Sequence, residues 1–283
     1  MTATILEGHA LADRMLAETR AKADAVAAAI GRRPRLVILL LREDPGALAY
    51  AERQAEFAAR AGIVAELRRV KADEDALALV AALNADAAID GILPLFPLPP
   101  HIDPLALAQA IAPAKDVDGL NPFNAGRLAV GLDALAPCTP QAAIMLAASV
   151  VGELRGLDVT VVGASIGVGR PLAQMLLQRE ATVTIAHVAT RDLAKACRGA
   201  DLLFVAVGKP GLIRAEHVKA GAVVIDIGIN VLDDGAGGKR IVGDVDVASV
   251  EQVASAISAA PDGVGPLTTA HLMANVVRAA QRR

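Results

Sequence analysis

A glycine-rich segment in the second half of the chain has the residue types that bind phosphate groups. Residues 163–171 read GASIGVGRP and follow Val159–Val162, an apolar run with the length of a β-strand. Glycines between a strand and a helix allow a tight turn and let backbone N–H groups approach a pyrophosphate. Ser165 stands at the second glycine position of the usual G-x-G-x-x-G pattern. The segment favours dinucleotide binding, and a purely structural turn is the alternative.

A second glycine-lined turn supports the same interpretation. Val207–Gly211 reads VGKPG and comes at the end of another apolar run, Leu202–Val207. Ligands of open α/β sheets bind at the carboxyl edge of the parallel strands, where both turns would lie. Together the two turns predict a dinucleotide site.

Other polar residues give weaker signals. Asp116 and Asp118 could hold a metal ion, but two acids at i and i+2 in a loop more often form turns or accept hydrogen bonds. The five histidines lack a ligand spacing such as H-E-x-x-H. Nothing near Cys138 in the sequence would activate it as a nucleophile, so we expect a packed small residue. We predict no metal site.

Several segments, colinear from Tyr50 to Thr268, resemble the signature segments of the methylenetetrahydrofolate dehydrogenase/cyclohydrolase family. Besides GASIGVGRP, they are KDVDG at 115–119, NAGRL at 124–128, PCTP at 137–140, AVGKPG at 206–211, VIDIGIN at 224–230 and GDVD at 243–246. The resemblance implies two α/β domains flanking a cleft, a nicotinamide cofactor on the second domain, a folate on the first, and a homodimer.

The resemblance also implies roles for single residues. Tyr50 would lie against the ring system of the substrate, with a core position as the alternative, and Asp118 would contact the amide edge of the pterin. The implied catalytic positions are Tyr50, Gln54 and Asp118, and the implied substrate-binding positions are Tyr50, Leu95, Asp118, Asp262 and Gly263. The implied cofactor-binding positions are Gly163, Ser165, Gly167, Val168, Gly169, Arg170, Val207, Gly208 and Ile229.

The sequence departs from the family's pattern in the substrate cleft. The family's Tyr-x-x-x-Lys motif reads YAERQ here, so Gln54 replaces the lysine. The family's Val-Gln-Leu-Pro-Leu-Pro segment reads PLFPLP, so Leu95 replaces the glutamine. The loop at 258–268, SAAPDGVGPLT, lacks one proline and has Asp262 in place of a glycine.

The changes at Gln54 and Leu95 affect hydrolysis more than hydride transfer. When hydride leaves a methylene group between two nitrogens, their lone pairs stabilise the cation, so positioning matters more than a protein base. Hydrolysis of that cation needs proton transfers, which a lysine of lowered pKa can perform and a glutamine amide cannot. We predict reduced or absent cyclohydrolase activity. Drift at an exposed helix position is the alternative.

The predicted function is NAD(P)-dependent oxidation of 5,10-methylenetetrahydrofolate to 5,10-methenyltetrahydrofolate. NADP is favoured, with NAD as the alternative, because His187 and Val188 follow the strand Thr182–Ala186 without an acid for the ribose diol. Arg170 and Arg191 are candidate phosphate partners. Two other functions stay open: an enzyme of the same fold acting on another reduced pterin or one-carbon adduct, and a non-catalytic folate- or nucleotide-binding homologue.

Strand-length apolar runs alternate with helical patterns, which predicts an α/β fold of parallel sheet covered by helices. In the first half we expect helices at His9–Ile30 and Ala47–Ala61, one capped by Asp73 and running to Leu83, and one after Pro104. The expected strands are Leu36–Leu41, Ile63–Val70 and Ile89–Leu93, and Gly62 should end the second helix.

The second half restarts this alternation. The expected strands are Val159–Val162, Thr182–Ala186, Leu202–Val207 and Val223–Ile227, with helices after Pro140, up to Gln178, around Leu193 and from Thr268, and a hairpin around Asp233–Lys239. We place the domain boundary near Pro137–Gln141. Residues 1–139 with the terminal helix 268–283 form the predicted three-layer substrate domain, and 140–267 a Rossmann-like dinucleotide-binding domain.

The composition excludes several classes of protein. The 283 residues allow two domains, and 54% hydrophobic with 21% charged residues exclude disorder. The net charge of −3 gives no basic stripe for nucleic acid, and the apolar runs are too short for a membrane span. Two cysteines fit a reducing compartment. We expect a soluble cytoplasmic protein that binds a tetrahydrofolate-type small molecule and neither nucleic acid nor membrane.

Overall fold

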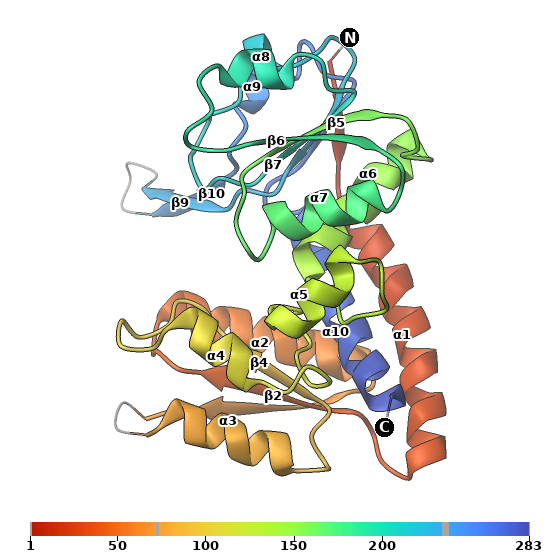
Figure 1. Ribbon diagram of the computed structural model, residues 1–283, viewed down its shortest axis with the longest axis vertical. Helices are drawn as coiled ribbons and strands as arrows, with labels where there is room; N and C mark the ends of the chain where they lie inside the picture. Colours follow the sequence, from red (N-terminus) through yellow and green to blue (C-terminus); the bar gives the residue numbers. More distant parts are fainter. Residues whose placement is uncertain (1, 72–73, 234–237, 283) are drawn as a thin grey trace. The chain divides into compact units, whose positions relative to one another are not determined.

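A computed structural model describes residues 2–71, 74–233 and 238–282, and the chain forms two compact units (Figure 1). Unit 1 comprises Met1–Ala12 and Thr139–Thr268, and unit 2 comprises Asp13–Cys138 and Thr269–Arg283. The sequence analysis placed the first twelve residues with the first half of the chain. Here strand β1 (Thr4–Leu6) pairs in parallel with β11 (Ala256–Ser258), which joins these residues to unit 1.

The sheet of unit 2 is parallel, with the strand order β3–β2–β4. The strands are β2 (Arg35–Leu40), β3 (Val64–Arg69) and β4 (Gly91–Pro94), close to the predicted runs. The central strand β2 is buried along nearly its whole length, as expected for a parallel strand with neighbours on both faces. Its core positions Val37 and Leu39 pack with Val80 and Leu107 from two helices that lie side by side (Figure 1).

The helices of unit 2 begin at polar capping residues. They are α2 (Pro45–Arg60), α3 (Ala76–Ala85), α4 (Pro104–Ala110) and α5 (Pro122–Ala129). Asp44, Asp75 and Asp103 accept backbone N–H bonds at the starts of α2, α3 and α4. The predicted cap Asp73 lies outside the described residues. Gly62 follows α2 with φ +73°, as predicted. Helix α5 was not expected, because the short NAGRL segment has little periodicity.

Three helices contain a boundary between the units. They are α1 (His9–Ile30), α6 (Cys138–Val151) and α10 (Val264–Gln281). The bounds of α1 agree with the predicted helix, whereas α10 begins four residues before the predicted Thr268. None of the described helices is long and apolar enough to cross a membrane.

The sheet of unit 1 has the strand order β1–β11–β8–β7–β5–β6, and its adjacent strands are parallel. The remaining elements are β5 (Asp158–Val162), α7 (Gly169–Leu177), β6 (Thr182–Ala186), α8 (Leu193–Cys197), β7 (Leu202–Val205), a 3-10 turn (Ala215–His217), β8 (Val223–Asp226) and α9 (Val247–Val250). After β6 the chain returns to the other side of β5. The carboxyl ends of β5 and β7 therefore form a topological switch point, the usual ligand site of such sheets.

A hairpin follows β8. Strands β9 (Asn230–Asp233) and β10 (Lys239–Val242) pair antiparallel, which confirms the predicted hairpin. Its tip, residues 234–237, lies outside the described part of the chain.

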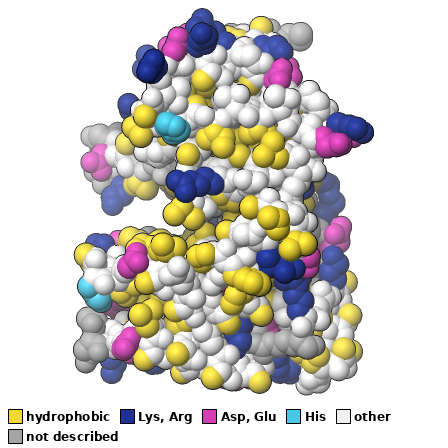
Figure 2. Space-filling model, in the orientation of Figure 1, with side chains coloured by type: hydrophobic (Ala, Val, Ile, Leu, Met, Phe, Trp, Pro, Cys, Tyr) yellow, Lys and Arg dark blue, Asp and Glu magenta, His cyan; other side chains and the backbone are white. Residues whose placement is uncertain are grey.

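On the face shown in Figure 2, basic and acidic side chains are interspersed, without a continuous field of one sign.

Candidate functional site

The predicted glycine turn joins β5 to α7 and needs glycine for steric reasons. A Cβ on Gly163, which has φ +118°, would lie 2.2 Å from the carbonyl oxygen of Ala206. A Cβ on Gly169 would lie 1.9 Å from the carbonyl oxygen of Gly163. Ser165 Oγ accepts the N–H groups of Val168 (3.2 Å) and Gly169 (3.4 Å). The serine at the unusual position therefore closes the turn from within.

Arg170 also supports this turn. Its Nε donates to the carbonyl oxygen of Ala164 at 2.9 Å, although the side chain is exposed. Arg170 was a candidate phosphate partner, and this bond fixes the start of its guanidinium beside the turn.

A cavity of about 550 Å³ opens at the switch point beside the turn. Residues at the ends of β5, β6 and β7 line it, including Gly163, Ser165, His187, Val188, Val207 and Lys209. Its place at the carboxyl ends of parallel strands is where a dinucleotide binds in such sheets. The other implied cofactor positions do not line this cavity; they are Gly167, Val168, Gly169, Arg170, Gly208 and Ile229, of which Ile229 is 54% exposed.

The first two charged residues of the KDVDG loop in unit 2, Lys115 and Asp116, form hydrogen bonds within the unit. Lys115 Nζ donates to the carbonyl oxygens of Leu83 (2.7 Å), Asn84 (2.8 Å) and Asp86 (2.7 Å), around the end of α3.

The carboxylate of Asp116 is likewise engaged within the loop. It accepts the N–H groups of Leu120 (3.1 Å) and Asn121 (2.9 Å) and the side-chain amide of Asn124 (2.9 Å). A metal-binding role of Asp116 does not fit these bonds. No group of three or more His, Cys, Asp or Glu among the described residues could hold a metal ion.

Asp118 has a different environment. Burial, followed by the charge of Asp116, raises the pKa of Asp118 to about 7, although the Cys138 thiol opposes this shift by hydrogen bonding. Desolvation, followed by the charge of Asp118, raises the pKa of the Tyr50 phenol. The two predicted residues therefore share one electrostatic environment, even though Tyr50 is 41% exposed.

The position of Asp118 is set by helix α10. Asn275 Nδ2 donates to the carbonyl oxygen of Val117, the residue before Asp118, at 2.8 Å and to that of Ala136, shortly before α6, at 2.9 Å. Gly119 has φ +70°, and a Cβ there would lie 2.4 Å from the backbone of Ala136. Sequence reasoning missed Asn275. The signal was a single amide in the apolar stretch LMANVV.

Gln54 lies in the interior of unit 2, one helical turn after Tyr50 on α2. Its side chain is fully buried, and Nε2 donates to Thr269 Oγ1 of α10 at 3.3 Å. Its Oε1 has no hydrogen-bond partner among the described residues. Leu95, directly after β4, is also buried. The expectation that Gln54 occupies an exposed helix position is therefore wrong.

Asp262 and Gly263 belong to unit 1. The carboxylate of Asp262 lies 3.4 Å from His9 Nε2, and its carbonyl oxygen accepts the N–H of Gly8 at 2.8 Å. A Cβ on Gly263 would lie 2.6 Å from the carbonyl oxygen of Ala259. Asp262 is thus tied to the start of α1.

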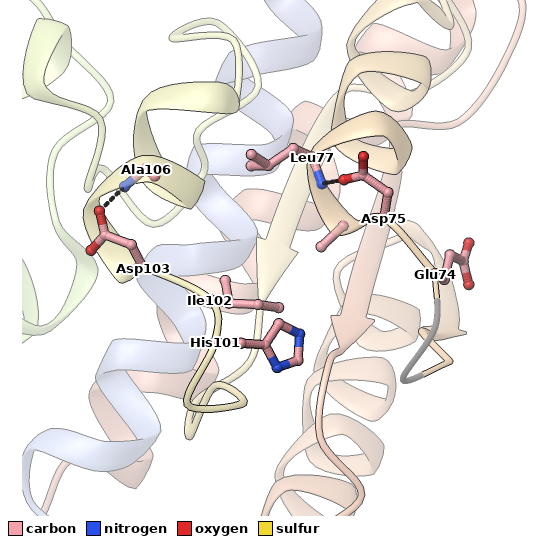
Figure 3. Close-up of a pocket in the computed structure, with 8 residues that line it drawn as sticks. Glu74, Asp75, Leu77, His101, Ile102, Asp103 and Ala106 are labelled. Atoms are coloured by element: carbon pink, nitrogen blue, oxygen red, sulfur yellow. Dashed lines mark hydrogen bonds between the residues drawn. The ribbon is translucent and has the colours of Figure 1, made fainter.

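Another cavity, of about 310 Å³, lies at the starts of α3 and α4 (Figure 3). Its acids are already engaged, because Asp75 and Asp103 cap the two helices and Glu74 accepts a bond from Arg68 at 2.7 Å. We assign no ligand to this cavity.

Two models of known protein families match the chain. Residues 6–118 match the model described as tetrahydrofolate dehydrogenase/cyclohydrolase, catalytic domain, and residues 137–283 match the NAD(P)-binding domain of the same family. The chain therefore belongs to the tetrahydrofolate dehydrogenase/cyclohydrolase family, as the resemblance implied.

Individual relatives cover nearly the whole chain. It is 47% identical over 284 residues to the bifunctional protein FolD of Methylorubrum extorquens, covering 99% of this chain and 92% of the relative. The bifunctional FolD enzyme of Campylobacter jejuni has a similar structure, with a TM-score of 0.93, 38% identity and 99% coverage of each chain. The Trypanosoma brucei enzyme, solved with NADP and an inhibitor, has a TM-score of 0.93 at 32% identity, covering 100% of this chain and 98% of that one.

The close approach at Gly169 predicts a strong effect of a single methyl group. We expect Gly169→Ala to weaken NADP binding about tenfold or more, because the new Cβ must displace the carbonyl of Gly163 and distort the turn. Calorimetric titration measures the change. Gly199→Ala is the matched control, since a Cβ there meets nothing within 4 Å. Equal affinities of folded Gly169→Ala and wild type would contradict a cofactor role of this turn.

The raised pKa of Asp118 predicts a stability effect with a definite sign. The folded state binds this proton more tightly than the unfolded state, so the resulting stability is present near pH 4 and is lost as pH rises through about 7. The asparagine of Asp118→Asn does not titrate, so this variant does not lose that stability as the pH rises. Between pH 5 and pH 8 its stability should therefore improve relative to wild type by on the order of 1–3 kcal/mol.

Urea unfolding at both pH values measures this difference. The matched control is Asp13→Asn, which removes an exposed carboxylate from the same unit. A difference between Asp118→Asn and wild type that does not change with pH would contradict the assignment.

Proposed function

We propose that this protein oxidises 5,10-methylenetetrahydrofolate to 5,10-methenyltetrahydrofolate by hydride transfer to NADP. The observation that carries the proposal is the cavity at the switch point of unit 1, bounded by the glycine turn, in a chain of this family. The turn after β6, His187–Arg191, contains no acid for the ribose diol of NAD. The bound NADP of the Trypanosoma brucei relative supports the same cofactor.

The residues of unit 2 would bind and orient the folate. NADP, when bound, supplies the acceptor for the hydride that leaves the methylene carbon, and the folate nitrogens stabilise the resulting cation. Asp118 would accept hydrogen bonds from the amino and amide protons of the pterin, and this contact favours the ionised carboxylate. Tyr50, exposed on α2, would lie against the ring system. Positioning is the main contribution of the protein to this step.

We also propose that hydrolysis of the methenyl product is reduced or absent. The position that the family's pattern gives to lysine is held by Gln54, whose amide does not titrate and is buried against Thr269. Leu95 offers no hydrogen bond where the pattern has glutamine. The curated relatives are called bifunctional, so this proposal marks a difference between this chain and them. The two alternative functions have no observation in their favour.

We place the protein in the cytoplasm as a homodimer. The buried thiols of Cys138 and Cys197 fit a reducing compartment. Strand β6 is an edge strand of the sheet in unit 1, and its Ile185 is 43% exposed, which suits burial against a second copy. Sedimentation equilibrium should give twice the mass of one chain. A monomer at micromolar concentration would contradict the dimer and leave the activity proposal untouched.

An absorbance assay tests the two activities separately. With methylenetetrahydrofolate, the wild-type protein should produce NADPH and methenyltetrahydrofolate, and the methenyl absorbance should then decay no faster than in buffer. No NAD(P)H signal with either NADP or NAD would refute the dehydrogenase proposal. Enzyme-catalysed decay of the methenyl compound would refute the loss of hydrolysis.

Restoring the family's residues should restore part of the hydrolysis. Gln54→Lys together with Leu95→Gln supplies an amine of titratable pKa and a partner to orient it. Gln54→Lys alone is the control and should do less, because the buried amine would keep only Thr269 as a described partner. Recovery should be incomplete, since the altered loop around Asp262 would shift the substrate and small misplacements can cost about a hundredfold.

A further inference from the structure

A fully buried carboxylate holds the second glycine turn of the cofactor cavity. Asp244 Oδ2 accepts the backbone N–H groups of Val207 (2.7 Å) and Gly208 (3.0 Å). Its Oδ1 accepts the N–H of Lys209 (2.8 Å) and Nδ2 of Asn230 (2.9 Å). Successive N–H groups that converge in this way form a site for an anion. Here the anion is a side chain of the protein.

A second buried carboxylate holds the first. Asp226, at the end of β8, accepts through Oδ1 the N–H groups of Gly228 and Asp244, each at 3.0 Å. Its Oδ2 accepts the N–H of Val245 at 2.9 Å. Asp226 therefore fixes the backbone of Asp244, and Asp244 in turn fixes the turn at 207–209.

Two glycines allow this arrangement. A Cβ on Gly228 would lie 2.2 Å from Cγ of Asp244, and a Cβ on Gly243 would lie 1.8 Å from Oδ2 of Asp226. Each carboxylate thus packs against a glycine beside the other. We call Asp226 and Asp244 the carboxylate pair, and Gly228 and Gly243 are the glycines that make room for it. It gives a structural role to aspartates and glycines of the VIDIGIN and GDVD segments, in which the sequence analysis singled out only Ile229.

The turn held by the carboxylate pair is a wall of the cavity. Val207 and Lys209 of this turn line the cavity. The carbonyl oxygen of Ala206, just before the turn, is the atom that leaves no room for a Cβ on Gly163. The N–H groups of 207–209 are used by Asp244 and do not serve as phosphate donors. The turn therefore contributes shape, and the Gly163–Gly169 turn is left to receive the pyrophosphate.

We propose that Asp244 is a positioning residue for the nicotinamide nucleotide, acting through the backbone of 207–209, with Asp226 holding Asp244 in place. The inference rests on the proposed use of NADP. It assigns to Asp244 no contact with the ligand and no part in proton transfer.

Asp244→Asn tests the proposal. The NH2 group of the asparagine would replace one acceptor oxygen and face backbone N–H groups of the turn, which are themselves donors. NADP should bind about tenfold or more weakly by calorimetry, while kcat at saturating NADP and KM for the folate stay within about threefold of wild type. Asp246→Asn is the matched control. That carboxylate, two residues later, accepts the N–H of Ser249 at the start of α9 and lies 3.9 Å from Arg214. The NADP affinity of Asp246→Asn should equal that of the wild-type protein.

Asn230→Ala decides the matter if Asp244→Asn does not fold. It removes one of the four donors and keeps the carboxylate, so NADP affinity should fall about two- to fivefold. Amide hydrogen exchange at 207–209 should become faster without a change in the strands β5 and β7. Wild-type affinity in a folded Asp244→Asn, or unchanged affinity and exchange in Asn230→Ala, would overturn the inference. Failure of the wild-type protein to bind NADP would instead overturn the proposed function.

Discussion

Backbone N–H groups in buried loops must find hydrogen-bond acceptors, and in both units of this protein a buried aspartate provides them. Asp116 accepts two loop N–H groups and the amide of Asn124 in unit 2. Asp244 accepts three loop N–H groups and the amide of Asn230 in unit 1. These carboxylates hold irregular backbone at the candidate sites, where strand pairing has ended. The shape of both sites depends on them.

The same constraint distinguishes two acids that are two residues apart. A carboxylate that accepts N–H bonds is stabilised in its charged form, whereas burial with few donors disfavours that form. Burial raises the pKa of both Asp116 and Asp118. The N–H donors around Asp116 oppose that shift, whereas at Asp118 the nearby charge of Asp116 adds to it and the pKa is raised to about 7. A ligand that donates hydrogen bonds to Asp118 would favour its ionised form, as the surrounding N–H groups do for Asp116.

Helix α10 holds several segments of unit 2 together through polar side chains. Thr269 bonds to Gln54, and Asn275 bonds to the carbonyl oxygens of Val117 and Ala136. A polar group in such a buried place is costly without a partner, and Oε1 of Gln54 lacks one among the described residues. Of the two polar atoms of the Gln54 amide, only Nε2 is therefore satisfied by a described residue, Thr269 of α10.

The sequence by itself determined the features that depend on local geometry. The alternation of strands and helices, the bounds of α1 and β6, and the glycine turn after β5 follow from periodicity and from backbone conformations that residues near each other impose. Colinear motifs were enough to identify the family. The three-residue strands β1 and β11 carry no periodic signal, and their pairing of Thr4 with Ala256 joins opposite ends of the chain.

Only the tertiary structure decided which residues of each motif hold the backbone through hydrogen bonds. Lys115, Asp116 and Asp118 are charged residues of one five-residue motif, and their environments differ because Lys115 reaches carbonyl oxygens at the end of α3 and Asp116 collects the N–H donors that Asp118 lacks among the described residues. The burial of Gln54 depends on α10, more than two hundred residues later. The role of Asp244 depends on the turn after β7 and on Gly228. Such contacts join residues far apart in the chain, so no local pattern records them.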